Sequence, residues 1–300
     1  MLKRLHIYTK EMYPIIPRLF LGLVIFFEIY FIMLLNHGVT EFAEFNIGVQ
    51  EAVGGFTIFS FLFMLRIADD FKDYESDRVL FPERPLPSGR VKKKDLAIFL
   101  TGLITVTAVL NFVFMNNIPF FLFLYFYGVL MSVWFFQRSK IQKNLFLALI
   151  THNPIMMVMN IYIISFACIK FHLPFFNLTN FLVALTLYFP ALIWEISRKI
   201  RAPRDETDYE TYSKRFGYKK ATRFVLIITI VDIVTNFLLV YRLNLVAVGV
   251  LFLNVLWMTW TFINFMTDPT RFKIIKKVER YTYITETTMV LVVALYLLGV

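Results

Sequence analysis

The chain has 300 residues and a net charge of +10, and it is 58% hydrophobic but only 17% charged. Soluble proteins are nearer half apolar and a quarter charged, so this composition excludes an ordinary water-soluble domain. A single cysteine, Cys168, excludes an internal disulfide and a cysteine-ligated metal centre.

Nine apolar stretches are candidates for helices that cross a membrane. A crossing needs roughly 20 residues, because the hydrocarbon core is about 30 Å thick and a helix rises about 1.5 Å per residue. No stretch alternates with the period of a membrane barrel strand. The expected spans are 13–35, 53–68, 95–115, 118–137, 145–168, 179–197, 221–241, 244–266 and 281–300. We therefore expect an all-α polytopic membrane protein of about nine transmembrane helices, forming a single domain over residues 1–300.

The basic residues indicate how these spans are oriented. With the N-terminus in the cytoplasm, all but two of the 31 Lys and Arg residues lie on the cytoplasmic side, and the exceptions are Lys170 and Arg242. Cytoplasmic loops of membrane proteins carry this excess of positive charge. The excess of Lys and Arg therefore indicates how the spans are oriented in a cell or inner membrane. It also indicates contact with anionic lipid or an anionic substrate, and not the binding of nucleic acid.

Acidic residues are concentrated at the cytoplasmic end of the second span. On a continuous helix Asp69, Asp73 and Asp77 share one face, because each lies four residues from the next. Carboxylates this close repel one another unless a cation neutralises them, and Mg²⁺ prefers such oxygen ligands together with substrate phosphates. The alternative is a solvated acidic helix end that neighbouring Lys and Arg side chains neutralise.

The next segment, 81–90, reads Phe-Pro-Glu-Arg-Pro-Leu-Pro-Ser-Gly-Arg. Its three prolines and its glycine end the helix and predict a stiff, extended loop. Arg84 lies in this loop, and the planar guanidinium of arginine suits the binding of a phosphate. A plain connector with basic residues at the lipid headgroups is the alternative.

The segment from Asp69 to Gly89 resembles the first signature of the UbiA superfamily of intramembrane prenyltransferases, an NxxxDxxxD motif followed by an RPLPSG-like loop. One departure is Asp69, which stands where the family has asparagine. The nine expected spans and a second acidic loop after the sixth span extend the resemblance to the whole chain. It implies a helical bundle around a central cavity, in which Mg²⁺ held by Asp69, Asp73 and Asp77 binds the diphosphate of a prenyl donor.

The second acidic segment follows the sixth span, four spans after the first, so both segments are expected on the same membrane face. Asp205 and Asp208 would be neighbours on a helix that starts at Pro203. They resemble a shortened form of the family's DxxxD-like pair, which implies that they bind metal. Glu195, at the end of the sixth span, is the alternative ligand, and Arg198 is one of the nearby cations expected to bind the diphosphate. An ordinary charged cytoplasmic loop is the remaining interpretation.

Three further signals are weaker. The resemblance implies that Lys140, after the fourth span, lies near the diphosphate, whereas Phe136 stands where family members often have tyrosine. Glu28 and Asp232 are ionisable groups within apolar spans, which indicates either a function or hydrogen bonding between helices. Segment 152–154, His-Asn-Pro, is expected to contact an acceptor or to bond a neighbouring helix around a proline kink.

Together these features predict a Mg²⁺-dependent prenyltransferase whose active site faces the cytoplasm. Asp69, Asp73, Asp77, Asp205 and Asp208 would act as metal ligands, and Arg84, Lys140 and Arg198 would bind the donor. Neutralising the diphosphate as its charge develops lowers the barrier to ionisation. A hydrophobic acceptor, commonly an aromatic ring in the family that the chain resembles, would then capture the allylic cation. One alternative is a UbiA-type terpene cyclase, in which the chain's own double bonds capture the cation. The other is a transporter, which the clustering of acidic residues at one membrane surface disfavours.

Overall fold

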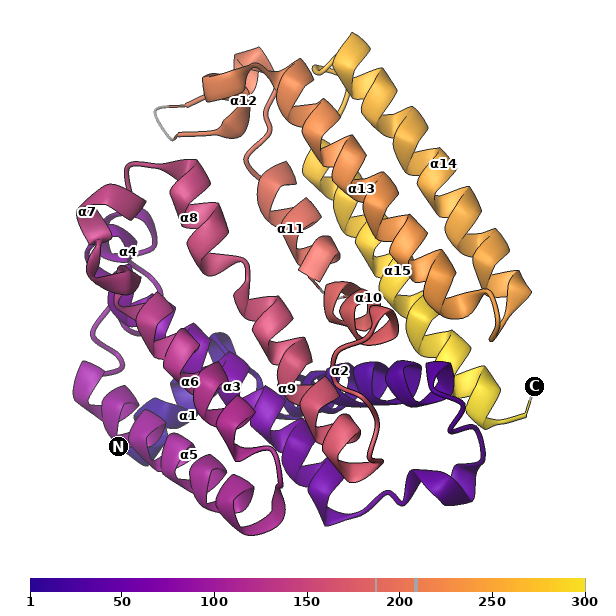
Figure 1. Ribbon diagram of the computed structural model, residues 1–300. Helices are drawn as coiled ribbons and strands as arrows, with labels where there is room; N and C mark the ends of the chain where they lie inside the picture. Colours follow the sequence, from indigo (N-terminus) through magenta and orange to yellow (C-terminus); the bar gives the residue numbers. More distant parts are fainter. Residues whose placement is uncertain (187, 208–209, 300) are drawn as a thin grey trace. The chain divides into compact units, whose positions relative to one another are not determined.

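The computed structural model describes residues 1–186, 188–207 and 210–299 (Figure 1). All regular secondary structure in these ranges is helical, which confirms the expected all-α class. The chain forms two compact units. Unit 1 comprises Met1–Tyr30, Asn46–Arg138 and Ser165–Leu173, and unit 2 comprises the remainder of the described chain.

Unit 1 is built mainly from the helices of the N-terminal half. Their bounds are α1 Leu2–Glu11, α2 Ile15–Asn36, α3 Val49–Lys72, α4 Tyr74–Leu80, α5 Lys93–Phe114 and α6 Ile118–Ser132, followed by the 3-10 turn η2 at Trp134–Phe136. The long helix α3 packs against both α5 and α6, and α1 packs against α5. The last turns of α2 belong to unit 2.

Unit 2 contains the C-terminal helices. Their bounds are η1 Phe42–Phe45, α7 Arg138–Ile141, α8 Leu145–His152, α9 Ile155–Lys170, α10 Leu178–Thr186, α11 Tyr188–Ser197, η3 Pro203–Asp205, α12 Tyr212–Phe216, α13 Tyr218–Val240, α14 Leu245–Thr267 and α15 Ile274–Leu297. The first residue of α7 and the end of α9, from Ser165 onward, belong to unit 1. Helix α14 packs against both α13 and α15, and α11 packs against the same two helices (Figure 1). The fifth expected span is interrupted between α8 and α9, where Pro154 cannot donate a backbone hydrogen bond.

Seven helical segments of the described chain are long and apolar enough to cross a membrane. Helix α6 has only 15 residues, because the chain turns into left-handed φ values at Trp134–Phe136. Helix α15 has 24 residues, but its first turns carry Lys276, Lys277, Glu279 and Arg280. The count of nine spans is therefore not confirmed, although helix is found in each of the nine expected stretches.

Helix α3 is longer than the expected span 53–68, and polar interactions extend it at both ends. At its start the Gly48 amide donates to Oε2 of Glu51 at 2.8 Å, which satisfies one of the free amides of a helix N-terminus. At its end Lys72 pairs with Asp69 at 2.9 Å, one turn apart. These contacts stabilise the turns of α3 that lie beyond its apolar part, so Asp69 is part of the helix.

Hydrogen bonds between side chains join the apolar helices of unit 1. The Thr107 hydroxyl of α5 donates to Ser60 of α3 at 2.7 Å, and the Asn111 amide of α5 donates to Thr57 of α3 at 2.8 Å. Such contacts between spans help membrane helices associate, because lipid provides no hydrophobic driving force. On the outward faces, large apolar side chains such as Phe112 stay exposed, as expected for surfaces in contact with lipid.

Candidate active site

The first acidic segment lies where α3 ends and α4 begins. Asp73 is the residue between the two helices, with φ −101° and ψ 10°. The helical hydrogen bonds nevertheless continue across it, since the Asp73 amide donates to the Asp69 carbonyl at 2.9 Å and the Asp77 amide donates to the Asp73 carbonyl at 2.8 Å. The four-residue spacing expected from the sequence is therefore kept through the junction.

Two of the three carboxylates are paired with cations. Asp69 pairs with Lys72 at 2.9 Å, and the Lys72 ammonium also lies 4.6 Å from the centroid of the Trp134 ring. Nη1 of Arg84 donates to Oδ2 of Asp77 at 2.9 Å. Arg84 therefore lies beside this acidic segment, and its pair with Asp77, like that of Lys72 with Asp69, also fits the alternative of an acidic helix end neutralised by neighbouring cations.

Asp73 differs from its two neighbours. Its carboxylate makes no ion pair or hydrogen bond with the described part of the chain. Partial burial raises the pKa of Asp73, and the negative charges of Asp69 and Asp77 raise it further, against the opposing effect of Lys72. A half-buried carboxylate beside two like charges is stabilised by any cation that binds there.

Asp70, the fourth acidic residue at this junction, is directed elsewhere. Its carboxylate is buried and accepts hydrogen bonds from the Tyr8 hydroxyl at 2.5 Å and from Nη2 of Arg66 at 2.7 Å. Both oxygens of Asp70 are therefore satisfied by protein groups. This side chain holds α1 against α3 instead of joining Asp69, Asp73 and Asp77.

The residues of the first segment fit Mg²⁺ shared with a phosphate ligand. Carboxylate oxygens are hard donors, and Asp73 is a half-buried carboxylate with negative neighbours. Within the described residues, however, no three His, Cys, Asp or Glu side chains converge as a metal cage made only of protein requires. This arrangement suits an ion that uses one or two carboxylates and completes its shell with water and substrate phosphate.

The loop after α4 is folded into turns and is not extended as its prolines predicted. Backbone bonds from Arg84 to Phe81, from Ser88 to Arg84 and from Val91 to the Pro85 carbonyl close successive turns within it. The Arg84 guanidinium carbon lies 3.9 Å from the centroid of the Phe81 ring. Arg84 is therefore held between an aromatic face and a carboxylate, which limits its rotation.

The second acidic segment lies in unit 2, between α11 and α12. Both oxygens of Glu195 are engaged by Arg198, at 2.5 and 2.8 Å, and Oε1 also lies 3.1 Å from the Lys199 ammonium. Asp205 is exposed, and the Arg204 guanidinium lies 3.7 Å from it. Glu195 is thus the more heavily neutralised of the two candidate ligands.

The expectation of a helix that carries both aspartates of this segment is wrong. Pro203 does begin a helical turn, but it is the 3-10 turn η3, which ends at Asp205. Glu206 then adopts extended geometry, with φ −69° and ψ 142°, and its carboxylate accepts hydrogen bonds from Thr211 and Ser213. Asp208 lies outside the described residues.

A cavity of about 400 Å³ lies beside this segment in unit 2. Arg198, Arg201 and Asp205 line it from the segment after α11, and Lys273 lines it from the start of α15. Arg204 donates to a carbonyl of the α14–α15 loop at 2.6 Å and so ties the two segments together. Sequence reasoning did not select Lys273, and the only signal for it is the basic run after the eighth expected span.

The weaker candidates have separate environments. Lys140 is exposed on α7. Glu28 is buried in α2. Asp232 is fully buried in α13 and accepts hydrogen bonds from the Tyr281 hydroxyl of α15 at 2.9 Å and from Asn236 at 3.1 Å. This agrees with the interpretation of Asp232 as a link between helices.

The fold and these polar segments define a polytopic, all-helical membrane protein with carboxylate and arginine groups at helix ends. The family described as the UbiA prenyltransferase family matches residues 14–282. The chain belongs to this family, as its Asp69–Gly89 segment predicted, and this membership implies a prenyl diphosphate donor and a membrane setting.

The structural comparison agrees with the family. A solved structure of a digeranylgeranylglyceryl phosphate synthase in membranes superposes with a TM-score of 0.70, over 99% of this chain and 100% of that chain. The two sequences are 15% identical, so the similarity concerns the fold. No curated protein matches the chain by sequence.

Proposed function

We propose that this chain is a Mg²⁺-dependent intramembrane prenyltransferase that moves an isoprenyl group from a prenyl diphosphate to a hydrophobic acceptor. Asp69, Asp73 and Asp77 would hold Mg²⁺ against the diphosphate, and Arg84 would bind a phosphate oxygen. Bound Mg²⁺ would supply charge neutralisation as the diphosphate leaves. The observation that carries this proposal is the Asp73 carboxylate, which has a raised pKa and lies between two further acids.

The second acidic segment would contribute further metal and diphosphate contacts. From the sequence, Asp205 and Asp208 are the proposed ligands, Glu195 is the alternative, and Arg198 would bind the diphosphate. The cavity beside Arg198 and Asp205 supports this role, because cations line it and favour an anionic ligand. Lys140 would assist in donor binding. Each role is a proposal for mutagenesis.

The test of this function is an assay of the purified protein with labelled prenyl diphosphates of several chain lengths. We expect diphosphate release that requires Mg²⁺ and an acceptor. Aromatic acceptors should be compared with a prenylated glyceryl phosphate, since the similar structure is that of a digeranylgeranylglyceryl phosphate synthase. Release with a cyclised product and no acceptor would indicate a terpene cyclase instead, and no consumption of any donor would reject both.

The distribution of basic residues also predicts the orientation. We propose that the N-terminus and both acidic segments face the cytoplasm. Cysteines that replace the exposed residues Lys93 and Arg215 should react with a membrane-impermeant reagent only from the cytoplasm, and one that replaces Glu44 only from outside. Cys168 is buried, so background labelling should be low. Labelling of positions 93 and 215 from opposite faces would contradict this orientation.

A further inference from the structure

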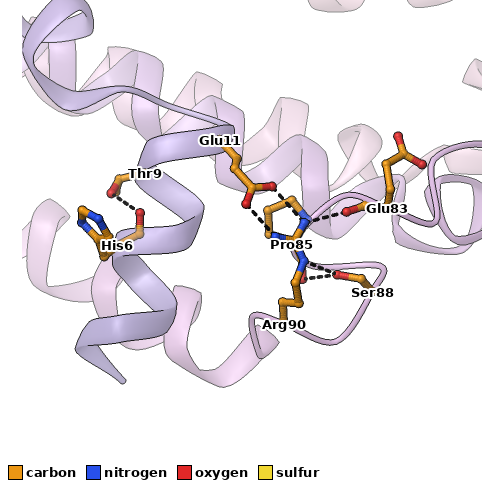
Figure 2. Close-up of polar contacts among 7 residues, drawn as sticks. All are labelled: His6, Thr9, Glu11, Glu83, Pro85, Ser88 and Arg90. Atoms are coloured by element: carbon orange, nitrogen blue, oxygen red, sulfur yellow. Dashed lines mark hydrogen bonds and ion pairs between the residues drawn. The ribbon is translucent and has the colours of Figure 1, made fainter.

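The loop that carries Arg84 is attached to the N-terminal helix α1 (Figure 2). The Glu11 carboxylate, at the end of α1, accepts two hydrogen bonds from Arg90, from Nη1 at 2.6 Å and from Nη2 at 2.9 Å. The same guanidinium donates to the Glu83 carbonyl at 2.6 Å and to the Ser88 hydroxyl at 3.1 Å. Arg90 therefore joins α1 to both sides of the Pro85–Pro87 turn, through the Glu83 backbone before it and the Ser88 side chain after it.

Apolar packing supports the same attachment. Leu86 and Val91 of the loop are buried in one cluster with Leu5 and Tyr8 of α1. Tyr13, between α1 and α2, and residues of α3 and α5 contribute the rest of this cluster, including Phe63, on which the Tyr8 ring stacks. Leu86 and Val91 of the loop thus share one apolar cluster with α1. The bidentate Glu11–Arg90 ion pair is a second link between the loop and this helix.

A second contact reaches the acidic segment itself. The buried Tyr8 hydroxyl donates to Asp70 at 2.5 Å, and Asp70 adjoins Asp69 in the last turn of α3. Helix α1 therefore touches both parts of the first candidate site, the acidic helix end through Tyr8 and the Arg84 loop through Glu11. The remaining ion pair of α1, between Arg4 and Asp95, reaches only α5.

We infer that α1 positions the donor-binding loop, with Glu11 and Tyr8 as positioning residues that do not themselves touch the substrate. This inference rests on the proposed role of Arg84 in binding the diphosphate. The chain of contacts runs from Glu11 through Arg90 to the Glu83 carbonyl and so to Arg84, which pairs with Asp77. When this attachment is lost, Arg84 is no longer held in the position in which it binds the donor diphosphate. The affinity for the donor then falls, whereas the rate of the chemical step is retained.

The test uses the full chain and two readouts. Glu11→Ala should raise the KM for the prenyl diphosphate about fivefold and leave kcat within about twofold, the scale of a well-oriented exposed ion pair. Amide hydrogen exchange within residues 81–92 should accelerate in Glu11→Ala and in Tyr8→Phe. Glu11→Gln, which keeps an acceptor oxygen, should have a smaller effect on both readouts.

Lys10→Gln is the matched control, because Lys10 is the exposed neighbour of Glu11 on α1 and, among the described residues, no hydrogen bond or ion pair joins it to the loop. It should change neither the KM nor the exchange. Unchanged exchange of residues 81–92 in both Glu11→Ala and Tyr8→Phe overturns the inference, as does a KM effect of the same size in Lys10→Gln. If the wild-type protein consumes no prenyl diphosphate, the proposed function fails, and the exchange experiment still decides whether α1 holds the loop.

Discussion

Asp73→Ala should lower kcat by about 100-fold or more, the scale observed when one preorganised electrostatic contact to a transition state is lost. The reason is that Asp73 is the carboxylate of the first segment without an ion pair among the described residues, so it is the one most available to a cation. Folding should survive, because the substitution removes a half-buried charge from beside Asp69 and Asp77. Turnover across a Mg²⁺ titration and a thermal melt measure the two effects separately.

Asp77→Ala should reduce turnover to a similar extent, but it also removes the partner of Arg84. Glu75→Ala is the matched control, because Glu75 lies on the same short helix, is largely exposed and sits 3.6 Å from Arg78. It should stay within about twofold of wild type, as expected for an exposed pair. Near-normal turnover of both Asp73→Ala and Asp77→Ala would reject the assignment of metal ligands in this segment.

In the second segment, Asp205→Ala should lower turnover about 100-fold, whereas Glu195→Gln should lower it only mildly. Glu195 already accepts from Arg198 and lies beside Lys199, so its charge is neutralised by protein groups. Asp205 is exposed and borders the cationic cavity, where its oxygens are accessible to an ion. From the sequence, Asp208→Ala should resemble Asp205→Ala.

The ranking of these variants decides between the two candidate ligands. A reversed order, with Glu195→Gln the more damaging, would assign the metal to the end of α11, because an amide is a much poorer ligand for a hard cation. Glu210→Ala, an exposed acidic residue of the same segment, is the control and should remain near wild type. Full activity in all three ligand variants would leave donor binding to the first segment and the basic residues.

Some of this architecture follows from the sequence alone. Apolar stretches of sufficient length predict helices whatever their partners, and helix is found in all nine. The spacing of Asp69, Asp73 and Asp77 also carries over, because backbone hydrogen bonds between residues four apart are local and survive the junction at Asp73. The family was recognisable for the same reason, since its first signature is a continuous segment.

Other features depend on contacts between distant residues. Asp69 and Asp70 are adjacent residues of the same type, and the sequence does not distinguish them. The hydroxyl of Tyr8, 62 residues before Asp70, donates to Asp70, so this carboxylate does not join the acidic cluster. Likewise, Glu11 meets Arg90 across 79 residues. Local propensity determines where helices form and which side chains share a face. Which of those side chains keeps a free charge is decided only by packing, because an ion pair forms wherever the fold brings its partner within reach.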